Sequence, residues 1–527
     1  MDEEKPEQRT METTMNYLHG GDVYRRRIDL DYSVNINPLG MPKSASEAAK
    51  HGVDESTAYP DWKVEELRDA VVSFINKKWS AEPASEVHAD TNVRPATTSA
   101  GAGMDVASTR TNPMNIVQPE WITFGNGAAD LIYRLMQVLR PAQVLVPAPA
   151  FSEYSVAARR VGAELCPIHL SEADDFAFTD VVEEAFLRGI EAAPVGSAVF
   201  LCNPNNPDGN GIPSERLHRI AMACEERSLY LIVDECFLPF LRSDVTMAGT
   251  QESVVADQRI STGRGAVPAA TTYSDEHAAS MIPFLSDFEH LVVLRAFTKI
   301  YGMPGLRLGY MLTRAKELTA SVQATMTPWE INLPAQRAGV AALQEENFVE
   351  KTCTVVHEER AFLVRVLPTL PYVEKVYAPE SDANFILFRI SGKLRRERAA
   401  ERMEQEAKET SEHLSRESAC PTEESVDLKA LLLEEGVLIR ACGNYDGLDD
   451  RYYRICVRTH AENLELVRRW QRLSGAQSVR TVRAFTQECS IMSALPEQVP
   501  TPAAPVHPLR TDRVSVSRKT EGRAHAI

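Results

Sequence analysis

Short apolar runs alternate with amphipathic stretches through the middle of the chain. Six runs have the length of strands, at residues 121–124, 144–146, 198–202, 229–233, 292–299 and 308–312. Apolar residues recur at helical spacing in residues 131–138, 214–224 and 315–325. Near-continuous apolar strands that alternate with helices predict an α/β domain whose mostly parallel sheet is buried on both faces.

The pattern differs on either side of this region. An amphipathic helix is predicted to begin after Asp61, which can cap it. Later in the chain, helical spacing over residues 334–368 and 462–473 is mixed with strand-like runs at 384–388, 436–440 and 452–457. This mixture predicts a second, smaller α+β domain. We therefore expect an N-terminal arm (residues 1–60), a large domain (61–325) and a small domain (326–474).

Four stretches lack apolar periodicity. Residues 80–118 and 243–286 have low hydrophobicity and are predicted to be disordered insertions in the large domain. Residues 392–425 are rich in Glu and Arg, so we expect a solvated helical insertion in the small domain. The tail, residues 475–527, is predicted to be disordered.

Composition narrows the class of protein. The 527 residues are 44% hydrophobic, and the formal net charge is −17 at pH 7. An acidic chain argues against nucleic-acid binding through phosphate neutralisation, and no apolar run reaches membrane-spanning length. Nine scattered cysteines without metal-ligand spacing predict reduced thiols and no metal site. Because the N-terminus lacks an apolar segment, a cytoplasmic location is predicted.

Residues suited to bind one cofactor follow the predicted strands. They are Gly127-Ala128-Ala129, Phe151, Asn206, Asp234 and Lys299. Taken singly, each has a simpler interpretation, such as a surface lysine, a helix cap, a turn or a core aromatic. In an open parallel sheet, however, ligands collect at the carboxyl ends of the strands. A lysine there can form a Schiff base, and an aspartate can keep a pyridine nitrogen protonated. We therefore predict a pyridoxal 5'-phosphate site.

The phosphate of this cofactor has its own candidate residues. The amides of Ala128 and Ala129 open a helix whose dipole favours an anion. Thr298 can add a hydroxyl group and Arg307 a charge. In the same site, Phe151 can stack on the cofactor ring.

The order of five motifs resembles the class I/II aminotransferase superfamily. They are Gly125-Asn126-Gly127, Asn203-Pro204-Asn205-Asn206-Pro207-Asp208-Gly209, Asp234-Glu235, Thr298-Lys299 and Gly305-Leu306-Arg307. The resemblance covers residues 17–473 apart from the insertions. It implies a fold-type I pyridoxal phosphate enzyme with a seven-stranded-type, mostly parallel sheet and a smaller α+β C-terminal domain.

Within that superfamily the chain is similar to the threonine-phosphate decarboxylase branch of cobalamin biosynthesis, close to histidinol-phosphate aminotransferases. The similarity lies in His19-Gly20-Gly21, Tyr59-Pro60-Asp61 and residues 30–40, 304–310 and 439–454. It implies decarboxylation of L-threonine O-3-phosphate to (R)-1-aminopropan-2-yl phosphate.

The resemblance also assigns roles to cofactor-binding residues. Lys299 would be the Schiff-base lysine, Asp234 would pair with the pyridine nitrogen, and Asn206 would donate to the phenolic oxygen. The phosphate would be held by Ala128, Ala129, Thr298 and Arg307. Tyr59 would reach the cofactor phosphate of a neighbouring subunit, which implies a homodimer.

Asn37, Arg440, Arg454 and His19 would bind the anionic groups of the substrate. The arginine pair also makes physical sense by itself, because guanidinium groups bind carboxylate or phosphate through two hydrogen bonds.

Three positions depart from the superfamily pattern. Asp208 stands where Thr is usual, and Ala296 stands where Ser or Thr commonly helps to bind phosphate, so we expect a somewhat weaker phosphate site. Phe237 replaces a tyrosine that many aminotransferases have, as it also does in the decarboxylase branch. Two alternatives stay open: transamination of histidinol phosphate on the same scaffold, and a non-catalytic scaffold.

Overall fold

The computed structural model describes residues 20–21, 23–24, 27–80, 116–241, 279–391 and 427–474. The predicted insertions and the tail lie almost wholly outside these residues. The two insertions predicted in the large domain end earlier than expected. Val117 is fully buried, and Met281 and Ile282 belong to the core. Within the described ranges, no helix combines the length and the apolar character that crossing a membrane requires.

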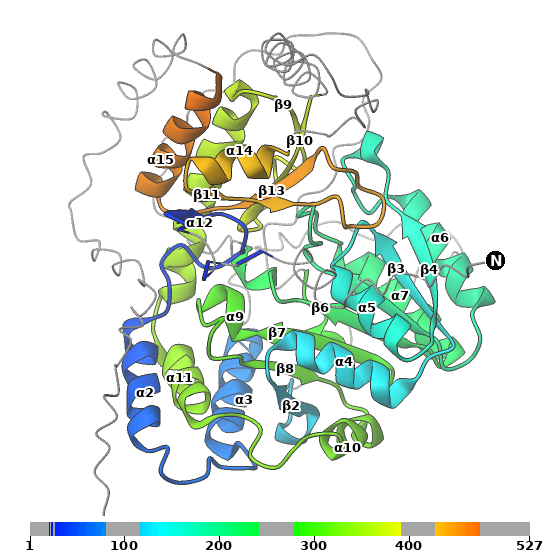
Figure 1. The fold of residues 1–527 in the computed structure, drawn as a ribbon. Helices are drawn as coiled ribbons and strands as arrows, with labels where there is room; N and C mark the ends of the chain where they lie inside the picture. The colour runs from blue at the N-terminus through cyan, green and yellow to red at the C-terminus, as the bar shows by residue number, and fades with distance from the viewer. Residues whose placement is uncertain are drawn as a thin grey trace, which may run out of the picture.

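A seven-stranded sheet carries the larger of two cores (Figure 1). Its strands are β2 (Ile122–Gly125), β3 (Gln143–Ala148), β4 (Glu164–His169), β5 (Ala198–Cys202), β6 (Tyr230–Asp234), β7 (Leu291–Ala296) and β8 (Gly309–Leu312). They are ordered β2-β8-β7-β6-β5-β3-β4. In this sheet β8 runs opposite to the other six strands, which are parallel to one another. This confirms the predicted α/β class with a mostly parallel sheet.

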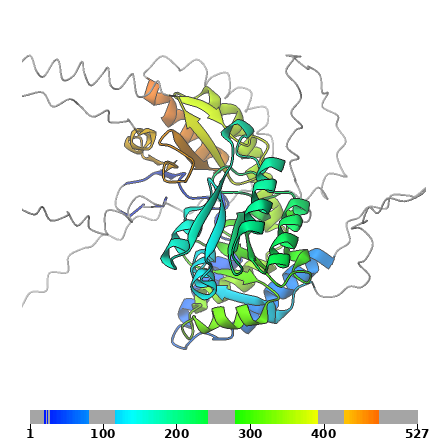
Figure 2. The ribbon, with the colours of Figure 1, turned by 90° about the vertical axis from the view of Figure 1, so that its right-hand side faces the viewer.

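Helices on both faces explain why the central strands are apolar throughout. Every residue of β5 and β7 is buried. The helices α4 (Ala128–Leu139) and α5 (Ser152–Arg160) pack together on one face, and α6 (Asp180–Ala192) and α7 (Ser214–Arg227) pack together on the other (Figure 2). No position in these strands can face solvent, so no polar alternation arises.

A four-stranded antiparallel sheet carries the second core, which confirms the predicted α+β character of the small domain. It has the order β12-β13-β10-β9, formed by β9 (Val373–Val376), β10 (Phe385–Ile390), β12 (Arg440–Ala441) and β13 (Tyr452–Cys456). The helices of this part are α12 (Phe348–Val366), α14 (Leu428–Glu434) and α15 (His460–Gln471). A capping box formed by Thr459 and Glu462 begins α15.

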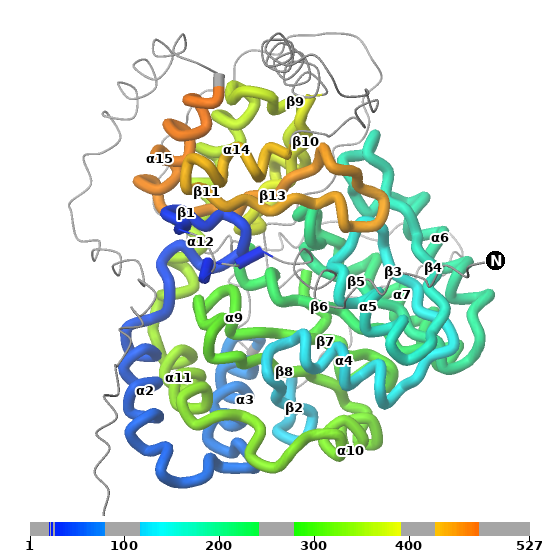
Figure 3. The backbone as a smooth tube through the Cα atoms, viewed as in Figure 1, coloured from blue at the N-terminus to red at the C-terminus, as the bar shows by residue number. Residues whose placement is uncertain are grey.

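The N-terminal arm joins this second core. Its strand β1 (Leu30–Asp31) pairs in parallel with β11 (Val437–Leu438), and the two lie side by side in Figure 3. The adjacent residue Tyr32 is fully buried in the second core. The predicted strand at residues 436–440 is therefore two short strands that pair with different partners.

Four further helices lie beside the large sheet. They are α2 (Lys43–Asp54), α3 (Glu65–Ser80), α10 (Lys316–Ala324) and α11 (Leu333–Gln344). Because α11 packs against α2 and α3, residues 333–344 belong with the large core and not with the small domain expected to start at residue 326. The predicted helix over residues 334–368 is also two helices, since Asn347 between them has a φ of 57°.

The strand that leads to Lys299 is shorter than predicted. β7 ends at Ala296, which is the last residue paired with β8, and the next four residues form the helical turn α9 (Phe297–Ile300). Lys299 therefore lies in a turn beyond the sheet and not on the strand itself.

Candidate active site

Four adjacent strands bring the predicted cofactor residues to one edge of the large sheet. Read across the sheet as β7, β6, β5 and β3, the segments at their carboxyl ends carry Lys299, Asp234, Asn206 and Phe151 in that order. Parallel strands end at the same edge, so residues far apart in the sequence share one site.

Lys299 lies in an electropositive and partly desolvated environment. Its Nζ is 5.5 Å from the centre of the Phe237 ring. Burial, followed by the positive charge of Arg454, lowers the pKa of Lys299 from 10.5 to about 8, although Cys236 and Asp234 act in the opposite direction. A larger fraction of this amine is therefore neutral and nucleophilic near neutral pH than for an ordinary lysine.

Asp234 is held in place by two hydrogen bonds. Its Oδ2 accepts a hydrogen bond from the Tyr154 hydroxyl at 2.8 Å, and its Oδ1 accepts one from the Cys236 amide at 3.0 Å. Burial and the charge of Asp234 raise the pKa of Tyr154 well above its ordinary value, so the hydroxyl stays a donor. Tyr154 also stacks on Phe200 and contacts the edge of Phe151. Sequence reasoning missed Tyr154.

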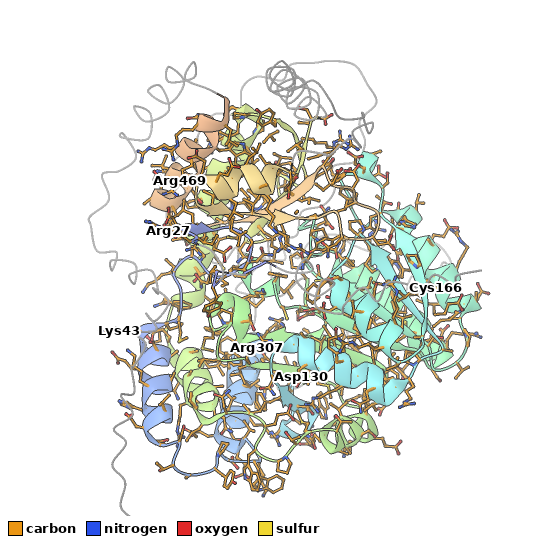
Figure 4. All side chains as sticks on the ribbon, viewed as in Figure 1. Arg27, Lys43, Asp130, Cys166, Arg307 and Arg469 are labelled. Carbon is orange, nitrogen blue, oxygen red and sulfur yellow. The ribbon has the colours of Figure 1, made fainter. Side chains whose placement is uncertain are left out.

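A glycine turn and an arginine form a cradle at the start of α4. Gly127 has a φ of 83°, and a Cβ atom there would lie 2.8 Å from the guanidinium group of Arg307. Arg307 donates to the Asn126 carbonyl at 3.1 Å, and Figure 4 labels it close to α4. Among the residues that the structure describes, no side chain caps α4.

This arrangement suits a phosphate group. The first amides of α4 and an exposed guanidinium face the same turn, as anion sites at helix N-termini require. Thr298 lies in α9, half-buried and next to Lys299. We call Gly127, Ala128, Ala129, Thr298 and Arg307 the phosphate cup.

Arg454 is a buried cation, with an exposed fraction of 6%. It donates to Asn206 Oδ1, to the Ser33 carbonyl at 3.2 Å and to the Tyr445 hydroxyl at 3.4 Å. Within the described ranges these partners are neutral, and its Nε has no partner. A buried charge without an opposite charge is costly, so Arg454 is suited to bind an anion.

Arg440 lies directly opposite Arg454 across the β12–β13 pair and is also buried. It donates to the Ala441 carbonyl and to Asn444 Oδ1, both at 2.8 Å, and lies 5.4 Å from the Tyr445 ring. Like charges opposite each other destabilise a strand pair. An anionic ligand between the two domains would offset this repulsion.

The orientation of Asn206 matches its predicted role. Its carbonyl oxygen accepts from Arg454, and its amide nitrogen has no acceptor within the described ranges. The free amide can donate to an oxygen of a bound cofactor.

Asn37, predicted to bind substrate, has a different role in the structure. Its Nδ2 donates to the Ile300 carbonyl at 2.6 Å and to Thr352 Oγ1 at 2.8 Å, and its Oδ1 accepts from the Leu39 amide. Both amide hydrogens are used, so Asn37 holds the turn that carries Lys299. Asn35 is a further candidate for contact with a ligand, because its buried Oδ1 lacks a partner in the part of the chain described and can accept a hydrogen bond from a ligand donor.

Two further residues are predicted to bind ligands: Tyr59, at the cofactor phosphate of a neighbouring subunit, and His19, at the substrate. Tyr59 is 77% exposed and stacks on Trp329, with ring centres 4.3 Å apart. His19 lies outside the described residues, although Gly21 after it donates to Ser33 Oγ at 2.8 Å. This hydrogen bond places Gly21 beside Ser33, and Arg454 donates to the carbonyl of Ser33.

Asp208, the first departure from the superfamily pattern, lies away from the phosphate cup. It is fully buried and accepts hydrogen bonds from the Asn205 side chain and, at 2.8 Å, from the Asn210 amide. Asn205 also donates to the Pro149 carbonyl at 3.0 Å. Asp208 therefore ties the loop that carries Asn206 to the loop after β3, and it is not part of the phosphate cup.

We expect Asp208 to make stability depend on pH. Burial raises its pKa from 3.8 to about 7, so the folded state holds its proton more tightly than the unfolded state does. The stabilisation of the folded state by this bound proton is complete below the pKa of Asp208 in the unfolded chain. It is lost as pH rises through the pKa of Asp208 in the folded chain. Between pH 5 and 8 it should fall by about 3 kcal/mol. In denaturant titrations at several pH values, Asp208→Asn should reduce the fall in the free energy of unfolding with rising pH. Asp174→Asn, at an exposed residue, should leave that fall unchanged. Parallel pH profiles for the wild type and Asp208→Asn would contradict the expectation.

Comparisons with known proteins agree with this geometry. Residues 27–469 match the family described as aminotransferase class I and II. Threonine-phosphate decarboxylase of Salmonella typhimurium is 29% identical over 460 residues, which cover 86% of this chain and 95% of that protein. Histidinol-phosphate aminotransferase of Methanosarcina mazei is 26% identical over 437 residues, covering 83% and 86%.

A solved structure shares the fold. Histidinol-phosphate aminotransferase from Sinorhizobium meliloti, in complex with pyridoxal-5'-phosphate, superposes with a TM-score of 0.56 at 16% identity. The match covers 87% of this chain and 92% of that one.

Proposed function

Because the chain belongs to the aminotransferase class I and II family, we propose that it decarboxylates L-threonine O-3-phosphate to (R)-1-aminopropan-2-yl phosphate, as in cobalamin biosynthesis. The observation that carries the proposal is the buried pair Arg440 and Arg454, opposite each other at the edge of the cofactor site. A phosphorylated amino acid brings a phosphate and a carboxylate, which two guanidinium groups can bind. The similarity to a threonine-phosphate decarboxylase supports the same substrate.

The cofactor of this family is pyridoxal 5'-phosphate, and the site fits it. The phosphate cup suits the phosphate group, Asp234 the pyridine nitrogen, Asn206 the phenolic oxygen and Phe151 the ring face. When bound, the cofactor supplies an electron sink for the bonds of the substrate α-carbon. Lys299 supplies the amine through which it is held.

The residues of the chain would set which bond breaks. Arg440 and Arg454 would bind the two anionic groups and so fix the orientation of the substrate in the site. Loss of CO2 leaves an electron pair on the α-carbon. Lys299, with a pKa of about 8, can carry a proton at neutral pH and deliver it to that carbon.

Transamination is the alternative on the same scaffold, and the similarity to histidinol-phosphate aminotransferases keeps it in view. It would need Lys299 to remove the α-proton. Phe237, whose ring centre lies 5.5 Å from the Lys299 amine, supports decarboxylation through resemblance, because the decarboxylase branch also has Phe where many aminotransferases have Tyr.

Product analysis tests the proposal. The purified protein with pyridoxal 5'-phosphate is incubated with L-threonine O-3-phosphate and CO2 is measured. In parallel it is incubated with histidinol phosphate and 2-oxoglutarate, and glutamate is measured. CO2 release without glutamate is expected. Glutamate without CO2 would favour the aminotransferase. If neither product forms and no visible absorbance band from bound cofactor is seen, a non-catalytic scaffold would be favoured.

A cytoplasmic location stays a prediction.

We also propose that the chain forms a homodimer through an exposed aromatic surface. Tyr59, Trp62 and Trp329 are exposed, and Tyr59 stacks on Trp329. Large exposed aromatic side chains are enriched at subunit interfaces. In sedimentation velocity the wild type should be dimeric, and Tyr59→Ala with Trp329→Ala should raise the monomer fraction at micromolar concentration. Val195→Ser, at an exposed apolar residue elsewhere, should not. A monomeric wild type would refute the proposal.

A further inference from the structure

The segment between α10 and α11 contacts both walls of the phosphate cup. We call residues 325–332 the brace. One wall is the turn around Asn126 and Gly127 before α4, and the other is the turn around Leu306 and Arg307. The two walls meet where Arg307 donates to the Asn126 carbonyl at 3.1 Å. Each wall also receives one side chain from the brace.

Glu330 fixes the first wall. Its Oε1 accepts a hydrogen bond from Asn126 Nδ2 at 3.0 Å and is also bonded by Arg134, while its Oε2 accepts from the Thr327 amide at 2.9 Å. Arg134 is bonded in turn to Asp130 in the first turn of α4. The Glu330 side chain is 9% exposed, so this network is shielded from water and its geometry is well defined.

Asn332 fixes the second wall. Its Nδ2 donates to the Leu306 carbonyl at 3.1 Å, and Leu306 precedes Arg307. Its Oδ1 caps α11 by accepting from the Ala335 amide at 2.9 Å. One side chain therefore links the start of a helix to the turn that presents the phosphate-binding arginine. Arg307 itself has a φ of 57°, a conformation that needs support from its surroundings.

We propose that Glu330 and Asn332 are positioning residues that hold the two walls of the phosphate cup at the spacing that the phosphate of the cofactor requires. Neither residue is placed to touch the cofactor; each acts through Asn126 or Leu306. The inference rests on the proposed cofactor site. Its physical basis is preorganisation: a wall that is ordered before binding loses less entropy when the ligand binds.

Electrostatics and positioning predict opposite results for Glu330. If Glu330 acted mainly through its charge, removing its carboxylate should tighten the binding of the phosphate dianion of the cofactor. Removing the support of Asn126 should weaken binding if Glu330 acts by position. The sign of the change in affinity therefore separates the two roles.

The test compares affinity for pyridoxal 5'-phosphate with affinity for pyridoxal, which lacks the phosphate. Both are measured on the full chain by titrating the apoprotein and following the visible absorbance band. The variants are Glu330→Ala and Asn332→Ser; the serine is neutral, can keep the α11 cap, and lacks the amide that donates to the Leu306 carbonyl. Glu317→Ala, at an exposed residue of α10, is the matched control.

Both variants should bind pyridoxal 5'-phosphate about tenfold more weakly and pyridoxal within about twofold of wild type. Equal or tighter binding of the phosphorylated cofactor would overturn the proposal, and so would an equal loss for both ligands, which indicates general damage. Should Glu330→Ala not fold, Asn332→Ser, which changes no charge, decides alone. A wild type that binds neither ligand would instead refute the proposed function, and the brace with it.

Discussion

Replacing Lys299 with alanine should abolish turnover, lowering kcat by about 10⁴-fold or more, and should remove the visible absorbance band of the bound cofactor. The expected loss is large because, in the proposed function, one amine would both hold the cofactor and supply the proton to the substrate. Steady-state CO2 release and an absorbance spectrum measure the two effects. Lys316→Ala, at an exposed residue of α10, should leave both unchanged.

The environment of Lys299 gives this prediction a pH signature. With a pKa of about 8, about 10% of the amine is neutral at pH 7, compared with about 0.03% at a pKa of 10.5. An amine-directed reagent should therefore modify Lys299 in the apoprotein with a midpoint near pH 8. A midpoint near 10.5, or an unchanged spectrum in Lys299→Ala, would contradict the assignment.

Arg454→Met should lower kcat/KM for L-threonine O-3-phosphate by about 10³-fold, or about 4 kcal/mol of transition-state stabilisation. The guanidinium group is buried, and its partners in the described part of the chain are neutral, so a bound anion would be its natural counter-charge. For substrate analogues that lack one anionic group, the same substitution should lower kcat/KM by a smaller factor. Arg454→Lys should restore part of the rate, because it keeps the charge without the planar geometry.

A second readout separates substrate binding from general damage. Because Arg454 lowers the pKa of Lys299, Arg454→Met should move the pH midpoint of Lys299 modification upward. Arg451→Met, in the turn just before β13 and paired with Asp449 at 2.8 Å, is the matched control and should change neither measurement. An Arg454→Met variant that lost equal activity on all substrates, with no shift in midpoint, would argue against the proposed role.

The edge of the large sheet was well predicted from the sequence, because strands buried on both faces leave continuous apolar runs. β5, β6 and β7 are such runs, and the residues after them had to share one edge. The edge strand β4 leaves no such pattern, unlike β2 at the other edge, whose four residues are all buried. The strand β4 mixes exposed and half-buried positions, and it was not predicted.

Roles that depend on tertiary partners could not be predicted. Asn35 and Asn37 are two residues apart in the same motif, and they are distinguished by tertiary contacts such as that of Asn37 with Thr352, 315 positions away. Tyr154 is similar: a tyrosine near the start of a helix gives no sign that it will bond Asp234, 80 positions later. The turn α9 was missed because the apolar run continues through Phe297, although the pairing with β8 ends at Ala296.

The pairing of β1 with β11 has a consequence for how the protein is made. Leu30 is paired with Val437, and the Tyr32 hydroxyl donates to Asn463, 431 positions later, at 2.9 Å. Closing so long a loop is slow, since contacts distant in sequence form late. During synthesis the arm must wait for nearly the whole described chain to leave the ribosome before it can dock. The strands of the large sheet end at residue 312, so this sheet can form first. The arm then stays unpaired until the residues of the second core have been synthesised.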